Sequence, residues 1–277
     1  MRLYGIISVV LLASLTSCGN KGGQATEEVP ADSVLTDSLR NDSLQAIVED
    51  YPMPKAADEL FDDFVYNFVV NRKLQMERTR FPLPCEKDGK TVQLTKEQWK
   101  PERFFMRQGY YTLLFNDDKQ MQLMKDTAVS EAVVEKILLS KNQVKNYVFQ
   151  RIKGAWLLLE IRVTPLQADA NSSFLSFYRR FVTDSAFQVK SLSETVDFVG
   201  PDPDDDFNMM EGVITPDTWE AFAPTLPHKT LYNIIYGKPQ PEGKQKIYLL
   251  RGVANGLEME LRFRKEGGKW LLKKLMT

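Results

Sequence analysis

Histidine and cysteine are nearly absent from this chain: its 277 residues include one His and two Cys. A structural zinc site takes about four His or Cys side chains, so this sequence cannot build one, and we expect neither a metal nor a cofactor. The one histidine, His228, follows the proline-rich stretch 224–227. A general base needs an orienting partner, which the sequence does not reveal, and we interpret His228 as a solvated loop residue.

An excess of charge of one sign is lacking too. The chain has 36 Lys and Arg against 37 Asp and Glu, and residues 51–277 hold 33 basic and 30 acidic side chains. Nucleic-acid modules concentrate positive charge on one face, so we expect no nucleic-acid partner. The sequence also lacks a glycine-rich phosphate loop and a Gly-x-Ser-x-Gly elbow, which mark common phosphate-binding and acyl-transfer sites. We therefore assign no catalytic residue.

Long hydrophobic runs are lacking except near the N-terminus. Arg2 precedes the apolar run Ile6–Ala13, which is too short to span a bilayer as a helix and fits a secretory signal. The following Leu15-Thr16-Ser17-Cys18 resembles the bacterial lipoprotein signal, in which the cysteine is lipidated and becomes the first mature residue. We predict a signal peptide over residues 1–17 and a lipid anchor at Cys18, with an ordinary secretory signal as the alternative. Two or more acyl chains give stable membrane attachment.

The resemblance also indicates a compartment. Gly19 follows the cysteine at the position where an Asp favours retention in the inner membrane. We therefore expect the outer membrane, and leave open whether the protein faces the periplasm or the surface. With Cys18 acylated, Cys85 has no intrachain partner, so the folded part must be held by packing alone. We interpret Cys85 as a thiol near a strand end rather than a reactive group.

Two acidic segments are interpreted as solvated chain. Residues 19–50 carry two basic and seven acidic side chains, and low hydrophobicity with negative charge predicts a disordered tether over residues 18–50. In the second segment, Asp202, Asp204 and Asp206 match the opening of a calcium-binding loop. Phe207 and Val213 stand where such a loop needs Gly and Glu, so we predict an inserted loop without calcium.

The remaining chain is organised around a helix that occurs twice. Three phenylalanines at i, i+3 and i+7 appear in two copies 113 residues apart: Phe61, Phe64, Phe68 and Phe174, Phe177, Phe181. This spacing places the rings on one face of an α-helix. A Gly-x-Trp hairpin closes each copy, with Trp156 and Trp270 114 residues apart. A helix and a hairpin repeated at nearly one interval predict one domain built twice, over residues 51–167 and 168–277, with both tryptophans buried.

The segments after each helix are predicted to be strands. Asp88-Gly89 is a hairpin turn signal between the strands expected at 79–83 and 91–94. Closing meanders are expected over 133–139, 144–152 and 155–163 in the first copy, and over 246–251, 256–264 and 269–276 in the second. The strand Tyr111–Phe115 has a counterpart in Tyr232–Tyr236. We expect Asp58 to cap the first phenylalanine helix, and Ser172 or Ser173 the second.

A helix followed by an antiparallel meander resembles the cone-shaped α+β fold of the nuclear transport factor 2 superfamily, in the cystatin-like group. The resemblance covers residues 58–277 and rests on the phenylalanine helices, the Gly-x-Trp hairpins, the run Arg80–Leu83 and two polar pairs, Asn71/Asp184 and Gln75/Gln188. Behind a lipoprotein signal, the chain is also similar to a family of Bacteroidetes envelope lipoproteins of unknown function. The resemblance implies two tandem nuclear-transport-factor-2-like (cystatin-like) domains, each a helix packed on a curved antiparallel sheet. It implies no activity.

Two functions are compatible with these observations. The first is a non-catalytic binding module, held at the membrane by Cys18, for an envelope protein or a small molecule. The alternative is a small-molecule hydrolase or isomerase that uses carboxylates and tyrosines such as Tyr66, Tyr110 or Tyr178 inside one cone. Enzymes of the resembled superfamily often use an Asp–His dyad, which the first copy cannot hold because it has no His. Aromatic side chains on helix and sheet favour filled cones, so we prefer the binding module.

Overall fold

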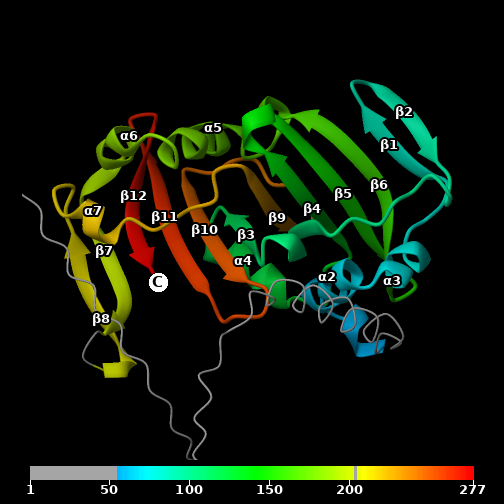
Figure 1. Ribbon diagram of the computed structural model, residues 1–277, viewed down its shortest axis with the longest axis horizontal. Coiled ribbons are helices and arrows are strands. Elements are labelled where there is room, and N and C mark those ends of the chain that lie inside the picture. The colour runs from blue at the N-terminus through cyan, green and yellow to red at the C-terminus, as the bar shows by residue number, and fades with distance from the viewer. Residues whose placement is uncertain (1–54, 203–204) are drawn as a thin grey trace, which may run out of the picture. The chain divides into compact units, whose positions relative to one another are not determined.

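The computed structural model describes residues 55–202 and 205–277 (Figure 1). The predicted signal peptide, Cys18 and the acidic tether lie outside the described residues. Pro203 and Asp204 of the acidic loop lie outside them too. Within the described ranges, no helix has the length and apolar character needed to cross a membrane.

The elements form two series in the same order. The first comprises α2 (Phe61–Val70), α3 (Arg72–Glu77), β1 (Leu83–Lys87), β2 (Lys90–Leu94), the 3-10 helix η2 (Phe104–Arg107), β3 (Tyr110–Phe115), α4 (Asp118–Met121), β4 (Glu131–Leu138), β5 (Gln143–Ile152) and β6 (Ala155–Pro165). The second comprises α5 (Ser172–Phe181), α6 (Ser185–Lys190), β7 (Leu192–Asp202), β8 (Asp205–Ile214), α7 (Trp219–Phe222), β9 (Thr230–Tyr236), β10 (Gln245–Gly252), β11 (Glu258–Glu266) and β12 (Lys269–Met276). The predicted helices and closing meanders are confirmed.

The strands of the described residues lie in one sheet, in the order β2-β1-β6-β5-β4-β9-β3-β10-β11-β12-β7-β8. Counted from its two edges inward, the sheet has equivalent strands in the same order: β2-β1-β6-β5-β4 on one side and β8-β7-β12-β11-β10 on the other. The two strands at the centre break this pattern. There β9 of the second series pairs with β4, and β3 of the first series pairs with β10. Each half therefore takes its innermost strand from the other half. The expected arrangement of two tandem domains is not confirmed, because the two halves share one continuous sheet.

The sequence predicts antiparallel sheets, and the structure corrects this prediction because the sheet is mixed. Parallel pairs occur between β1 and β6, between β7 and β12, and between β3 and β9. The physical reason is connectivity: long segments containing other elements join the partners in each pair, and parallel strands require such crossovers. The β3–β9 pair lies at the centre of the sheet and is registered at Thr112 and Asn233.

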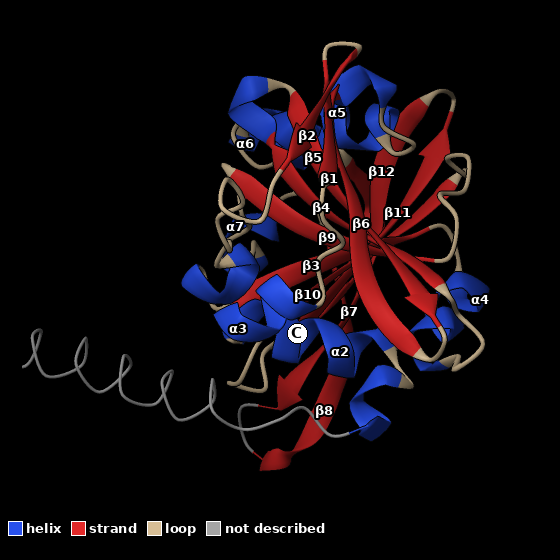
Figure 2. Ribbon diagram, turned by 90° about the vertical axis from the view of Figure 1, so that its right-hand side faces the viewer, coloured by secondary structure: helices blue, strands red, loops and turns tan. Residues whose placement is uncertain are grey.

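The halves build two hydrophobic cores on opposite faces of this sheet. In β3, Leu113 and Phe115 pack in the core beneath α2, whereas Leu114 packs in the core beneath α5. Strands β4, β9 and β10 divide their apolar side chains between the two cores in the same way. Both views place α2 and α3 on one side of the strands and α5 and α6 on the other (Figures 1 and 2). The central strands are thus covered on both faces.

The repeated aromatic residues occupy equivalent places. The ring of Phe61 lies 4.8 Å from that of Trp156, and the ring of Phe174 lies 5.4 Å from that of Trp270. Both tryptophans are buried, as predicted. Edge-on aromatic pairs of this kind add about 0.5–1.5 kcal/mol each beyond the area they bury. The phenylalanine stripe therefore packs each helix onto the strand that carries its tryptophan.

The predicted helix caps are wrong. Leu60 stands at the N-cap of α2, and the Asp58 carboxylate instead accepts a hydrogen bond from the backbone N–H of Trp156 (3.1 Å) and pairs with Arg78 (2.9 Å). At α5, neither serine caps, because the Glu242 carboxylate accepts from the backbone N–H of Phe174 at 2.7 Å. Glu242, which is distant in sequence, thus satisfies the backbone donor of α5 that an adjacent serine was expected to satisfy, and Asp58 stabilises contacts away from α2.

Capping side chains occur one helix later, at the repeated polar pair. Asn71 accepts from the N–H of Leu74 at 2.8 Å, and Asp184 accepts from the N–H of Phe187 at 2.9 Å. An Asn or Asp at this position satisfies a free donor in the first turn of the helix. Asn71 is both the C-cap of α2 and the N-cap of α3, whereas α5 has its C-cap at Val182, two residues before Asp184 caps α6.

Side chains strengthen the seam between the exchanged strands. Asn233 of β9 accepts from the N–H of Leu114 at 2.9 Å and donates to the Glu135 carboxylate at 2.7 Å. Glu135 is 3% exposed. Its burial, together with the nearby Asp169 carboxylate, raises its pKa well above the ordinary value. Its surroundings therefore favour the protonated form of Glu135 at the centre of the sheet.

We expect Glu135 to make stability depend on pH. A carboxyl group whose pKa is raised by folding stabilises the fold below its unfolded pKa, about 4.3, and that stability is lost as the pH rises through the folded pKa. Glu135→Gln keeps the size and hydrogen bonds of the protonated acid, so its free energy of unfolding should fall less with rising pH than that of the wild type. Urea unfolding of both proteins between about pH 5 and 7.5 measures this. Lys246, whose pKa burial lowers to about 8, begins to titrate at the upper end of that window in both proteins, so the difference between them reports Glu135. Identical pH dependence in both proteins would contradict the expectation.

Candidate functional site

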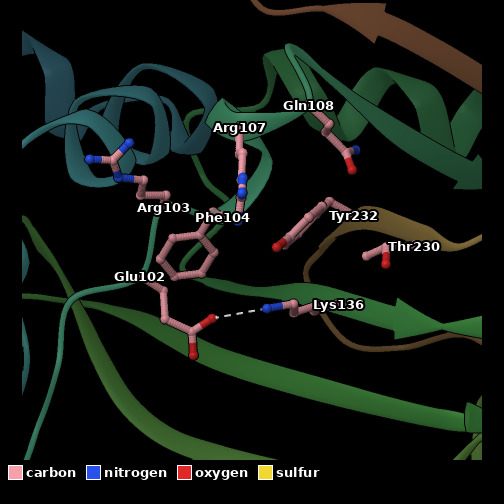
Figure 3. A pocket seen from close by; sticks show the side chains of 8 residues that line it. All are labelled: Glu102, Arg103, Phe104, Arg107, Gln108, Lys136, Thr230 and Tyr232. Carbon is pink, nitrogen blue, oxygen red and sulfur yellow. Dashed lines mark hydrogen bonds and ion pairs between the residues drawn. The ribbon is translucent and has the colours of Figure 1, made fainter. Parts of the chain in front are cut away.

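A polar cavity of about 410 Å³ opens at the edge of the core beneath α2 (Figure 3). Its lining comes from three separate segments: residues 102–108 around η2, Lys136 of β4, and Thr230 and Tyr232 of β9. Because β9 belongs to the second half of the chain, the wall of this cavity depends on the strand exchange. We call it the polar cavity.

Gln75 of α3 positions one side of the polar cavity. Its side-chain amide donates to the backbone carbonyl of Glu102 at 2.9 Å and accepts from the backbone N–H of Glu102 at 3.0 Å. Gln75 is fully buried, so this pair of hydrogen bonds is shielded from water. The counterpart Gln188 accepts from the indole N–H of Trp219 at 2.9 Å. The repeated glutamine therefore fixes the segment that follows the second strand in each half.

The backbone is strained where this segment enters the cavity. Phe104 has a φ of 42°, in the left-handed region that a bulky residue rarely adopts. Its ring is held 4.7 Å from that of Tyr147 and 6.0 Å from that of Phe68. Strain of this kind costs about 1–3 kcal/mol and persists where packing enforces it. Phe104 thereby closes the inner end of the polar cavity.

Ion pairs neutralise part of the charge in the polar cavity. The Glu102 carboxylate pairs with Lys136 at 3.4 Å and more closely with Lys145. Burial would raise the pKa of Glu102, but the two lysines outweigh it and lower that pKa. The ammonium of Lys136 lies 5.8 Å from the centre of the Tyr232 ring. One carboxylate thus faces two lysines.

Arg107 adds a further cation without a counter-ion. Its guanidinium lies between Phe104 and Tyr232 in Figure 3, whereas that of Arg103 points away from Tyr232. Arg107 is exposed to solvent, and within residues 55–202 and 205–277 its guanidinium takes part in no ion pair and no side-chain hydrogen bond. A planar guanidinium offers a fork of donors suited to carboxylates and phosphates. The arrangement of Arg107, Lys136 and the Tyr232 hydroxyl is therefore suited to hold an anion.

A second cavity of about 570 Å³ lies at the corresponding edge of the other core. Its lining is mainly apolar and includes Leu226, Leu250, Leu257 and Met259. Gln108 and Thr230 line both cavities. These residues lie next to the parallel starts of β3 and β9, so the two cavities meet around the seam of the sheet. We call this one the apolar cavity.

The residues singled out from the sequence do not come together. Tyr178 is fully buried and donates to the carbonyl of Pro227 at 2.9 Å, which is a structural contact. Tyr110 and His228 line the apolar cavity, and Tyr66 is exposed at another, smaller cavity. Cys85 lies in β1 as a free thiol. No catalytic constellation had been assigned to them, and the residues of the polar cavity were not identified from the sequence.

The smaller cavity, of about 80 Å³, holds a carboxylate–tyrosine pair. The Tyr236 hydroxyl donates to the carboxylate of Asp62, which lines the cavity together with Tyr111. Burial raises the pKa of Asp62, although the Tyr236 hydrogen bond opposes this shift. The space accommodates only a few water molecules. In the described part of the chain, no group of three or more His, Cys, Asp or Glu side chains could hold a metal ion.

The fold defines the class of the protein. It is similar to the crystal structure of an NTF2-like protein from Bacteroides fragilis, with a TM-score of 0.73 and 40% sequence identity over 81% of this chain and 98% of that chain. The chain thus has an NTF2-like fold, of mixed α+β type with a large curved sheet and few helices.

The family follows from a second comparison. The model described as "Domain of unknown function (DUF4348)" matches residues 40–277, and the chain belongs to this family. No functionally curated protein matches the chain. The resemblance to an NTF2-like family of unknown function is confirmed, whereas the lipid anchor and the assignment to Bacteroidetes stay predictions.

Proposed function

We propose that this protein is a non-catalytic binding module of the cell envelope, anchored to the outer membrane through acylated Cys18, that holds a small anionic ligand in the polar cavity. The observation that carries the proposal is Arg107, a cation without a counter-ion in a cavity that also presents Lys136 and the Tyr232 hydroxyl. The lipoprotein signal in the sequence supports the anchor. The family assignment is compatible with the proposal and adds no activity to it.

Inorganic phosphate and acetate are the probes that test this site. We expect both to bind to the wild type, and Arg107→Gln to weaken binding about tenfold or more, since a charge-assisted hydrogen bond contributes about 1.5–3 kcal/mol. Isothermal titration calorimetry at low ionic strength measures the affinities. Arg72→Gln is the matched control because it removes the same charge from an exposed side chain of α3 that does not line the polar cavity. Equal loss in both variants, or no binding to the wild type, would contradict the proposal.

The Asp62–Tyr236 pair supports a second candidate, a hydrolase or isomerase that uses a carboxylate and a tyrosine inside one core. Its small cavity argues for the binding module instead. We expect the wild type and Asp62→Asn to hydrolyse p-nitrophenyl acetate at the same rate, equal to that of the buffer. A wild-type rate above that of Asp62→Asn, with a pH profile that follows one carboxyl group, would favour the enzyme. Spectrophotometric detection of nitrophenolate provides the measurement.

A further inference from the structure

The two cavities share a wall and differ in polarity: polar and apolar groups line the polar cavity about equally, whereas apolar groups dominate the apolar cavity, which also has His228 and Lys229 in its lining. Gln108 and Thr230 line both, and the Gln108 amide is turned toward the backbone by its hydrogen bond to the carbonyl of Tyr110, at 2.8 Å. On one side of this wall lies the unpaired guanidinium of Arg107. On the other side, Leu226, Leu250 and Met259 line the apolar cavity. A ligand that crosses the wall meets a cation at one end and hydrocarbon at the other.

The exposure of its lining residues shows that the apolar cavity opens to the surface and is not a gap enclosed within the core. Leu250 is 4% exposed and belongs to the core beneath α5, whereas Leu257 is 41% exposed at the rim. The lining therefore runs from the core to the surface. A concave, mainly apolar lining with a few polar groups is typical of ligand-binding pockets.

We propose that the natural ligand is a single amphipathic anion, an apolar chain that ends in a carboxylate or a phosphate. The anionic group binds at Arg107 and Lys136, and the chain passes Gln108 and Thr230 into the apolar cavity. This inference rests on the proposed function and adds the ligand class. A small hydrophilic anion would use the polar cavity alone and leave Leu257 and Met259 in contact with water.

A series of straight-chain carboxylates from butanoate to dodecanoate tests the inference. The probe protein is the chain from residue 18, produced without its signal peptide so that neither lipid nor detergent competes. Affinity measured by calorimetry should rise about fourfold for each methylene group that enters the apolar cavity, which corresponds to about 0.8 kcal/mol. Dodecyl phosphate and dodecanoate together identify the preferred anionic group.

Two variants test separately the binding of the apolar chain and the binding of the anionic group. Leu257→Asp, at an exposed position that tolerates a charge, should flatten the dependence on chain length and leave butanoate binding unchanged. Arg107→Gln should weaken the binding of every carboxylate by a common factor. Circular dichroism of both variants verifies the fold.

The outcomes distinguish this inference from the proposed function. If butanoate and dodecanoate bind equally well, the ligand is a small anion: the inference is overturned and the proposed function stands. If dodecanol binds as tightly as dodecanoate, the anionic group is unimportant and both fail. If no carboxylate or phosphate binds, both fail as well.

Discussion

Phe68→Ala should reduce the free energy of unfolding by about 3–5 kcal/mol, the usual cost of a fully buried phenylalanine. The Phe68 ring is completely buried and lies 5.2 Å from that of Phe149. Its removal leaves a cavity where α2 packs on the sheet. A domain is stable by about 5–15 kcal/mol in total, so the loss is a large fraction, and calorimetry should detect it as a clear fall in the melting temperature.

The transition should remain single. The sequence repeat predicts one domain built twice, and two independent domains of this kind would melt separately. The strand exchange argues for the opposite, because β9 completes the core beneath α2 and β3 completes the core beneath α5. Phe181→Ala is the matched variant, since its ring lies 5.4 Å from that of Phe263, the counterpart of Phe149. Two transitions, with a different one shifted in each variant, would contradict a shared fold.

Cys18→Ala should release essentially all of the protein from membranes. The prediction depends on acyl chains at this one residue, because two or more chains supply stable membrane attachment. Without the cysteine, the lipoprotein peptidase has no substrate, and the signal peptide should remain uncut. Membrane fractionation followed by mass determination of the N-terminus measures both effects.

Cys85→Ala is the control for the anchor. It removes the other cysteine of the chain, which lies in β1 within the folded part. This variant should fractionate with membranes like the wild type and be processed normally. If Cys18→Ala pelleted with membranes as firmly as Cys85→Ala, the lipid anchor would have to be abandoned.

Local patterns were sufficient to predict the helices and most strands. Phenylalanines at i, i+3 and i+7 have one simple solution, a helix with an apolar face, and α2 and α5 confirm it. The turn signal Asp88-Gly89 likewise predicted the β1–β2 hairpin, where both residues adopt positive φ. The first strand of this hairpin lies at Leu83–Lys87 and not at 79–83, as was predicted. These features depend on neighbours in sequence, so a single chain reveals them.

The strand exchange could not be predicted in this way. Residues 111–115 and 232–236 are alike in apolar character, so either strand suits either half, and the choice depends on contacts across more than 100 residues. The residue pattern of the two strands does contain one indication that they lie at the centre of the sheet. Both strands are mostly apolar and lack alternation, with Thr112 or Asn233 as the single Thr or Asn in the run, and such a pattern is typical of strands covered on both faces. Two single-faced domains would have produced alternating strands at these positions.

The polar cavity escaped prediction for a related reason. Glu102, Arg107, Lys136 and Tyr232 come from three segments and form no motif. The repeated glutamine is part of the family resemblance, but the sequence does not indicate that the Gln75 side chain makes two hydrogen bonds to the backbone of Glu102. A buried side chain that binds a distant peptide group carries no periodic signature.

The exchange of β3 and β9 also determines when the protein can fold. A ribosome releases the first half long before Thr230, the first residue of β9, so the core beneath α2 stays open until most of the chain has been made. Long-range strand pairing is intrinsically slow to form. A fragment that ends before β9 lacks the strand that pairs with β4. The arrangement therefore requires both halves of the chain before either core is covered.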